Sequence, residues 1–319
     1  MLSLQNTFTS TGSKLLRHGD LLTKWSQGIP TPLFVEVALT EACTLNCQFC
    51  SVKNREKKYI WDYDRLISAT NSFIKLGIKA ITISGGGDPL CYSHVNDYLK
   101  FLLANHLQVG LITNGIGLNT VLDPVYLNQL SWLRISSNVF DYKDSISIPE
   151  DREAFKGTLG FSYVWTEGIS TYNKLLEIKQ IALKNKVEYV RLIPNCISTS
   201  QEQIKNNKFI VSLANGLGHP FFAQPKVFSI SDQCLWGYVK PFLYCDEYLY
   251  PCSSTVLNPD ADKKFNTSYR WCHYTEIEKV WSEPIKTIID TSRCTHCVFC
   301  EQNKIMQYAL LPQTHEDFI

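Results

Sequence analysis

Segments with strand character alternate with segments of helical character between residues 33 and 215. Apolar, β-branched runs predict six strands, at 33–40, 79–84, 107–113, 132–137, 158–165 and 187–193. Apolar residues at helical spacing predict helices at 64–77, 94–106, 123–130, 170–185 and 201–215. Such alternation builds a parallel sheet with right-handed crossovers. Six strands are fewer than the eight of a closed barrel, so we expect a partial (β/α)6 TIM-like barrel. Its ligand site should lie at the carboxyl ends of the strands.

The alternation of predicted strands and helices ends at about residue 216. After it, Gly, Pro, aromatic residues and cysteines become frequent. We interpret 216–228 as a linker from the α/β barrel into a second, small cysteine-rich unit, and 301–311 as a closing helix. The expected domains are an N-terminal extension (1–30), the barrel (31–215) and the cysteine-rich domain (216–319).

Cysteine content and charge narrow the class of protein. The chain has 12 cysteines in 319 residues, three at 43–50 and seven between 234 and 300. No apolar signal core opens the sequence, so we expect a cytoplasmic protein with reduced thiols, in which clustered cysteines bind metal rather than form disulfides. The formal net charge of +1 argues against a nucleic-acid partner, and no apolar run is long enough to span a membrane.

The first cysteine group follows directly on the first predicted strand. Cys43, Cys47 and Cys50 lie in the stretch CTLNCQFC and should meet at the mouth of the barrel. Iron–sulfur clusters and structural zinc sites usually take four protein ligands. Three thiolates would leave one metal position open for another molecule. A zinc knuckle or plain buried thiols are the alternatives.

This stretch resembles the C-x3-C-x2-C signature of the radical S-adenosylmethionine (SAM) superfamily, including the aromatic Phe49 before the last cysteine. The resemblance covers roughly residues 33–200. It implies that Cys43, Cys47 and Cys50 bind a [4Fe–4S] cluster whose fourth iron binds SAM. It also implies an enzyme that cleaves SAM reductively to a 5′-deoxyadenosyl radical, which then abstracts a hydrogen atom from the substrate.

Other strand ends fit the same family. Gly86, Gly87, Asp88 and Pro89 resemble its GGEP motif, with aspartate in place of the commoner glutamate. Glycine permits close approach of the backbone to a ligand. The resemblance further implies SAM contacts from Asn114 in the TNG that ends the third strand, and from Ser136 or Asn138 at the end of the fourth.

The C-terminal cysteines resemble the SPASM and twitch auxiliary domains of radical SAM enzymes. That pattern has a glycine between its first cysteines, where this chain has Glu247. Seven thiols suffice for one four-ligand cluster, for which the expected set is Cys234, Cys252, Cys294 and Cys297, with Cys245 and Cys300 as alternatives. A zinc ion, with His273 or His296 among its ligands, is the competing interpretation.

Two cysteines outside these groups, Cys91 and Cys196, are candidate hydrogen-atom donors, although a lone cysteine is more often a small core residue. The resemblance implies a reducing partner such as flavodoxin or ferredoxin. The substrate is expected to be a small molecule of the sugar or polyol type that is oxidised or rearranged. The alternatives are a ribosomally made peptide that is crosslinked, oxidised or epimerised, and a non-catalytic zinc-binding module. About thirty residues precede the first strand, which favours the small molecule.

Overall fold

The fold is taken from a computed structural model, which describes residues 7–9, 11–53, 55, 57–195, 197, 200–226, 229–256, 267–294 and 296–311. A single ten-stranded sheet runs through these residues in the order β10-β9-β8-β1-β2-β3-β4-β5-β6-β7. None of the described helices is long and apolar enough to cross a membrane.

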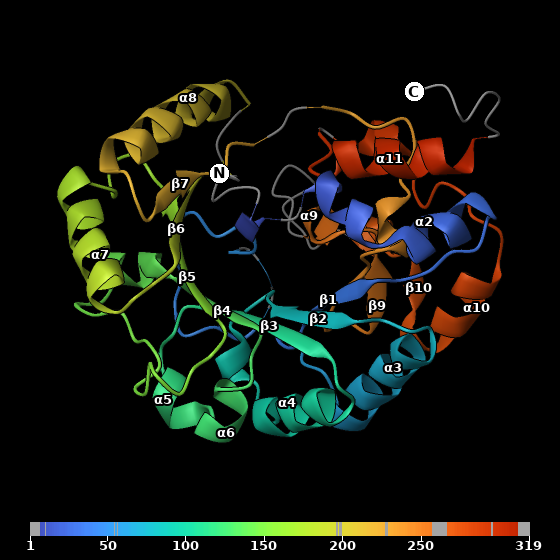
Figure 1. The fold of residues 1–319 in the computed structure, drawn as a ribbon, viewed down its shortest axis with the longest axis horizontal. Coiled ribbons are helices and arrows are strands. Elements are labelled where there is room, and N and C mark those ends of the chain that lie inside the picture. The colour runs from blue at the N-terminus through green and yellow to red at the C-terminus, as the bar shows by residue number, and fades with distance from the viewer. Residues whose placement is uncertain are drawn as a thin grey trace.

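The first seven strands are parallel and curve into an open barrel (Figure 1). They are β1 (Phe34–Ala38), β2 (Ala80–Ser84), β3 (Gln108–Thr113), β4 (Trp132–Ser136), β5 (Thr158–Trp165), β6 (Tyr189–Pro194) and β7 (Phe221–Ala223). The helices that follow the outer arc are α3 (Tyr63–Lys75), α4 (Val95–Ala104), α5 (Leu118–Val121), α6 (Pro124–Leu127), α7 (Tyr172–Lys184) and α8 (Ser200–Leu217). This arrangement confirms the partial barrel predicted from the alternation.

Local signals explain where the outer helices begin and end. The Asp62 carboxylate accepts a hydrogen bond from Arg65 N at the start of α3, and the Thr171 hydroxyl accepts one from Lys174 N at the start of α7. Gly77 follows α3 with φ +86°, a conformation that glycine adopts without steric cost. These local signals mark where α3 and α7 begin and where α3 ends.

The strands present alternate residues to the two faces of the sheet. On β4, Leu133 and Ile135 are fully buried in the core cluster, whereas Arg134 and Ser136 lie on the opposite face. Ser136 lines a cavity at the barrel mouth, as does Ile193 near the end of β6. The interior face therefore carries both polar and apolar residues, and the opposite face of β4 packs in the hydrophobic core.

The C-terminal part extends the same sheet. β8 (Phe242–Leu243) pairs in parallel with β1, and β9 (Tyr248–Tyr250) pairs antiparallel with β8 and with β10 (Cys272–His273). The remaining α-helices are α2 (Gly19–Ser26), α9 (Ser253–Val256), α10 (Ile277–Ser282) and α11 (Cys300–Leu310). Short 3-10 helices lie at Gly12–Arg17, Pro89–Cys91, Ser137–Asp141, Trp236–Tyr238, Thr267–Tyr269, Tyr274–Glu276 and Thr291–Arg293.

The N-terminal helix α2 lies beside the closing helix α11 (Figure 1), where buried Trp25 donates a hydrogen bond to Met306 O at 2.8 Å. The interpretation of 216–228 as a linker is wrong for residues 221–223, because they form β7 and pair with β6. The division of the chain into domains at 1–30, 31–215 and 216–319 stays a prediction.

Candidate active site at the barrel mouth

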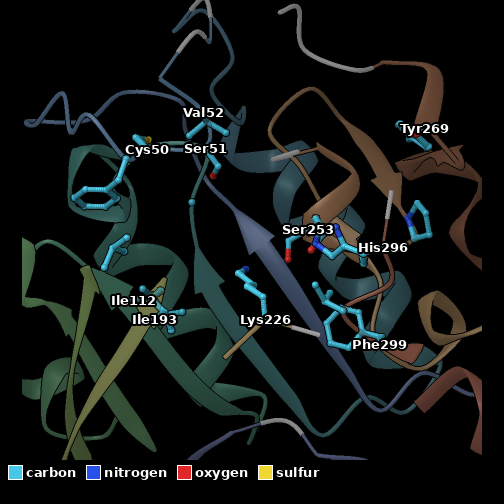
Figure 2. Close-up of a pocket in the computed structure, with 18 of the residues that line it drawn as sticks. Cys50, Ser51, Val52, Ile112, Ile193, Lys226, Ser253, Tyr269, His296 and Phe299 are labelled. Carbon is cyan, nitrogen blue, oxygen red and sulfur yellow. The ribbon is translucent and has the colours of Figure 1, made fainter. Parts of the chain in front are cut away.

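One cavity of about 530 Å³ brings the two cysteine groups together. Its walls include the three cysteines that follow β1 and four of the seven C-terminal cysteines, namely Cys43, Cys47, Cys50, Cys234, Cys252, Cys294 and Cys297. Figure 2 shows Cys50 on one side of the cavity and Ser253, His296 and Phe299 on the other, with Lys226 between them. The volume is in the range of small-molecule sites.

Backbone hydrogen bonds fix the loop that carries the first three cysteines. Gly87 N donates to Thr40 O at 2.8 Å, and Asp88 N donates to Ala42 O at 2.8 Å. Glu41, which is 1% exposed, accepts hydrogen bonds from Lys58 N and from the Tyr244 hydroxyl at 2.7 Å. The loop is therefore held from the β2 side and from the C-terminal part of the chain.

Each thiol of this first group has a polar neighbour. Cys43 Sγ lies 3.7 Å from Asn114 Nδ2, Cys50 Sγ lies 3.6 Å from Arg55 Nη1, and the Tyr142 hydroxyl, which accepts a hydrogen bond from Gln48 N at 3.1 Å, lies near Cys47. Burial, and then the charges of the other two thiolates, raise the pKa of Cys47 to about 12. A thiol with this pKa stays protonated at neutral pH unless a metal displaces the proton. Three converging thiols with hydrogen-bond donors around them fit metal ligation.

The three consecutive glycines at the end of β2 leave no room for side chains. A Cβ on Gly85 would lie 1.8 Å from Gly87 O, one on Gly86 would lie 2.4 Å from the Tyr244 hydroxyl, and one on Gly87 would lie 2.0 Å from Ala42 O. These approaches are to the chain itself. The glycines thus let β2, the cysteine loop and Tyr244 pack in direct contact.

Asp88, the residue that departs from the family motif, makes internal contacts. Its carboxylate accepts hydrogen bonds from Leu90 N, from the Thr113 hydroxyl and from Asn114 N at 2.6 Å. The side chain is 4% exposed, and burial raises the pKa of Asp88 while the hydrogen bond from Asn114 N opposes that shift. Asp88 therefore positions Asn114, whose amide reaches Cys43 and Thr44.

The C-terminal thiols form a second group. Burial raises the pKa of Cys234, and the neighbouring Cys252, Cys294 and Cys297 raise it further. Asn303 of α11 donates to Cys297 Sγ at 3.3 Å, and its amide oxygen accepts from Leu235 N and Trp236 N. This contact ties α11 to the chain beside Cys234.

The alternative ligands other than His296 lie outside the cavity lining. Cys245, Cys272 and Cys300 are buried and outside the cavity lining, and the Cys300 thiol donates to Ile230 O at 3.2 Å. His296 lines the cavity, whereas His273 contacts Thr275 and Glu247. Within the described ranges, no three His, Cys, Asp or Glu side chains gather tightly enough for one metal ion. A [4Fe–4S] cluster does not require its ligands to meet at one metal ion, since its thiolates bind different iron atoms.

The other predicted residues divide into two sets. Phe49, Gly86, Gly87, Asp88, Asn114 and Ser136 line the cavity, but Pro89, Asn138 and Cys91 do not. Asn138 is 1% exposed and bonds to Val164 and Asp141, while Cys91 packs beside Thr44 and Cys43. Cys196 lies outside the described residues. Their roles toward a cofactor or substrate stay predictions.

Among the residues that sequence reasoning missed are Arg55, Arg191 and Lys226, which line the cavity, and Tyr244, which supports the cysteine loop through Glu41. Arg55 lies in a charged stretch that reads as a solvated loop, yet its Nε donates to Glu41 O at 2.7 Å. Arg191 had a signal, because a charged residue in the middle of an apolar strand is unusual. Lys226 and Tyr244 come from the C-terminal third, and only the tertiary fold places Lys226 in the cavity lining and Tyr244 against Glu41.

We predict that Tyr244→Phe lowers the free energy of unfolding by about 1–3 kcal/mol, because it leaves a buried oxygen of Glu41 without its donor. Urea denaturation of the anaerobic protein measures this loss. Tyr308→Phe is the matched control, since Tyr308 is 65% exposed. A loss as small as that of the control would contradict the structural role of this contact.

Comparisons with known proteins agree with this geometry. A family model of the radical SAM superfamily matches residues 37–134, which run from β1 through the cysteine loop and the glycines into β4. Residues 37–134 form a radical SAM domain. This match implies a [4Fe–4S] cluster and SAM, as the resemblance of the cysteine motif predicts.

Two curated relatives of this chain are named for reactions on nucleotides. One is a GTP 3′,8-cyclase from Microcystis aeruginosa, 26% identical over 116 residues, or 34% of this chain and 35% of the relative. The other is an S-adenosylmethionine-dependent nucleotide dehydratase from a Fibrobacter species, 27% identical over 165 residues, or 49% of this chain and 48% of the relative. The matches thus span about a third and about half of these relatives.

Solved structures share the fold. SuiB of Streptococcus suis bound to S-adenosylmethionine aligns with a TM-score of 0.53 at 14% identity, over 83% of this chain and 72% of SuiB. The protein anSMEcpe, with bound AdoMet and a Cp18Cys peptide, aligns with a TM-score of 0.51 at 14% identity, over 90% of this chain and 85% of the other. At this identity, the likeness supports the radical SAM fold alone.

Proposed function

We propose that this chain cleaves SAM reductively at a [4Fe–4S] cluster held by Cys43, Cys47 and Cys50, and oxidises or rearranges a small molecule of the sugar or polyol type. When bound, the cluster supplies the electron that splits SAM into methionine and a 5′-deoxyadenosyl radical. The observation that carries the proposal is the shared cavity, which is lined by a three-thiol group and a four-thiol group.

In this proposal, the residues of the chain bind SAM, orient the cysteine ligands and shield the reacting atoms from water. The backbone at Gly86 and Gly87 lines the cavity next to the cysteine loop, where its carbonyl oxygens can accept hydrogen bonds from the ammonium of SAM. Ser136 lies at the end of β4 and offers a hydroxyl to a ribose or carboxylate. Asp88 and Asn114 keep Cys43 in place through the hydrogen bonds described above. The apolar Ile112, Val164 and Ile193 exclude water from the reacting atoms.

The four-thiol group supports a second [4Fe–4S] cluster on Cys234, Cys252, Cys294 and Cys297. Oxidation of a substrate radical releases one electron, and an acceptor in the same cavity can take it. We expect anaerobic reconstitution to load about eight iron atoms per chain, and Cys252→Ala to lower this by about four. Iron, sulfide and zinc analyses measure the outcome. About four iron atoms and one zinc ion in the wild-type protein would instead show that the second site is a zinc site.

A peptide substrate is the second candidate, because two proteins of similar fold were solved with peptides, SuiB with the precursor peptide SuiA and anSMEcpe with a Cp18Cys peptide. Small-molecule and peptide fractions of a cell extract can be compared for how strongly each increases 5′-deoxyadenosine formation. The small-molecule fraction should be active, and activity confined to the peptide fraction would replace the first candidate with the second.

A further inference from the structure

Two cations line the cavity on the side formed by β6 and the segment that follows β7. They are Arg191 of β6 and Lys226. Arg191 lies on the same face of β6 as Ile193 but two residues deeper in the barrel. Lys226 extends into the middle of the cavity in Figure 2. Neither cation belongs to the thiol groups or to the loops that hold them.

Neutral partners hold the side chain of Arg191 and the backbone of Lys226 in place. Arg191 Nη1 donates to Gln224 Oε1 at 3.0 Å, and Gln224 is two residues before Lys226. The backbone of Lys226 is clamped by Asn207 of α8, which donates to Lys226 O and accepts from Lys226 N, both at 2.9 Å. The two charges therefore come from segments that are joined to each other and anchored to a helix.

No carboxylate of the described residues forms an ion pair with Arg191 or Lys226. Asp88 is the acidic residue in the cavity lining, and its carboxylate oxygens are occupied by Leu90, Thr113 and Asn114. Arg191 Nε is buried and has no hydrogen-bond partner. Burial, and then the nearby charge of Arg134, lower the pKa of Arg191 to about 9, which is the direction expected for a cation that lacks a counter-ion.

A half-buried guanidinium whose Nε has no partner and an ammonium in the same cavity are suited to an oxyanion. Arginine presents a planar fork to phosphate or carboxylate oxygens, and lysine adds a point charge. Two positive charges without an acidic partner match a phosphate monoester, which carries about −1.5 to −2 at neutral pH. A carboxylate carries one negative charge and would leave the pair half neutralised.

We propose that Arg191 and Lys226 bind a phosphate group of the substrate, so that the small molecule in this cavity is a phosphorylated one. The proposal rests on the proposed function only in treating this ligand as the substrate. The phosphate would lie on the side of the cavity that is formed by β6 and the segment after β7. Its position there would set how deeply the substrate enters the cavity.

Inorganic phosphate is the probe, and its binding to the anaerobically reconstituted, unreduced protein is followed by phosphorus NMR at constant ionic strength. We expect saturable binding that Arg191→Gln and Lys226→Gln each weaken at least about tenfold, the effect of losing one charge-assisted hydrogen bond. Lys75→Gln is the matched control, because Lys75 is an exposed surface lysine, and it should bind phosphate as the wild type does. If Arg191→Gln does not fold, Arg191→Lys and Lys226→Gln carry the test.

The titration is run with and without SAM and contains no reductant. Its outcome is therefore independent of whether SAM is cleaved, so failure of this proposal and failure of the proposed function are distinguishable. Acetate is titrated in parallel. Equal competition by acetate would overturn phosphate in favour of a carboxylate. Absence of saturable phosphate binding, or binding that neither variant weakens, would overturn the anion site.

Discussion

Replacement of any one of Cys43, Cys47 and Cys50 by alanine is expected to lower the iron content of the reconstituted protein by about four atoms per chain. The remaining two thiols cannot hold a cluster that already lacks a fourth protein ligand. Reductive SAM cleavage should fall to the background of the buffer. Iron and sulfide analysis together with the broad cluster absorbance measure the first effect.

Cys272→Ala is the matched control for these variants. Cys272 is buried in β10, lies outside the cavity lining and should be dispensable for metal. Full iron content in all three variants of the first group, or an equal loss in Cys272→Ala, would contradict the assignment of the first cluster.

The second large effect is expected from Gly87→Ala. The added methyl carbon would lie 2.0 Å from Ala42 O and 2.6 Å from Glu41 C, so the backbone that precedes Cys43 must move. Overpacking of this kind costs about 1–3 kcal/mol and sometimes more. A shift of about 1 Å in a reacting geometry can cost about a hundredfold in rate. We therefore expect a lower unfolding midpoint in urea and a SAM cleavage rate reduced about a hundredfold.

Gly216→Ala gives the same chemical change without the contact. Gly216 has no atom within 4 Å of the position of a Cβ and lies in α8, where alanine is favoured over glycine by about 1 kcal/mol. This control should be unchanged or slightly more stable. Cleavage by Gly87→Ala at the wild-type rate would show that the close approach at the glycines does not position the cysteine loop.

The barrel could be predicted because each of its strands carries its own periodic signal. β5 was expected at 158–165 and is found at Thr158–Trp165, since a long apolar run bounded by polar residues has few other solutions. β7 was missed because three residues between a Pro and a Gln give no periodicity. Its place depends on pairing with β6, which is a tertiary contact.

The candidate site could be predicted where the spacing of residues along the sequence indicates metal ligands. The cysteine motif and the glycines are local signals, whereas the partners of Arg191 and the contact between Tyr244 and Glu41 join segments far apart in the chain. Glu247 is an instructive case. The family pattern has glycine at its position, and Glu247 has φ +71°, the left-handed conformation that explains the preference. Here Arg65 and His273 bind its carboxylate in that turn.

The central claim, an iron atom left without a protein ligand so that SAM can occupy it, is tested most directly by one assay. The reconstituted wild-type protein is incubated with SAM and dithionite under strict anoxia, and 5′-deoxyadenosine is quantified by mass spectrometry. The account predicts that 5′-deoxyadenosine forms together with an equal amount of methionine and that neither forms without dithionite. A fully iron-loaded protein that releases no 5′-deoxyadenosine would contradict it.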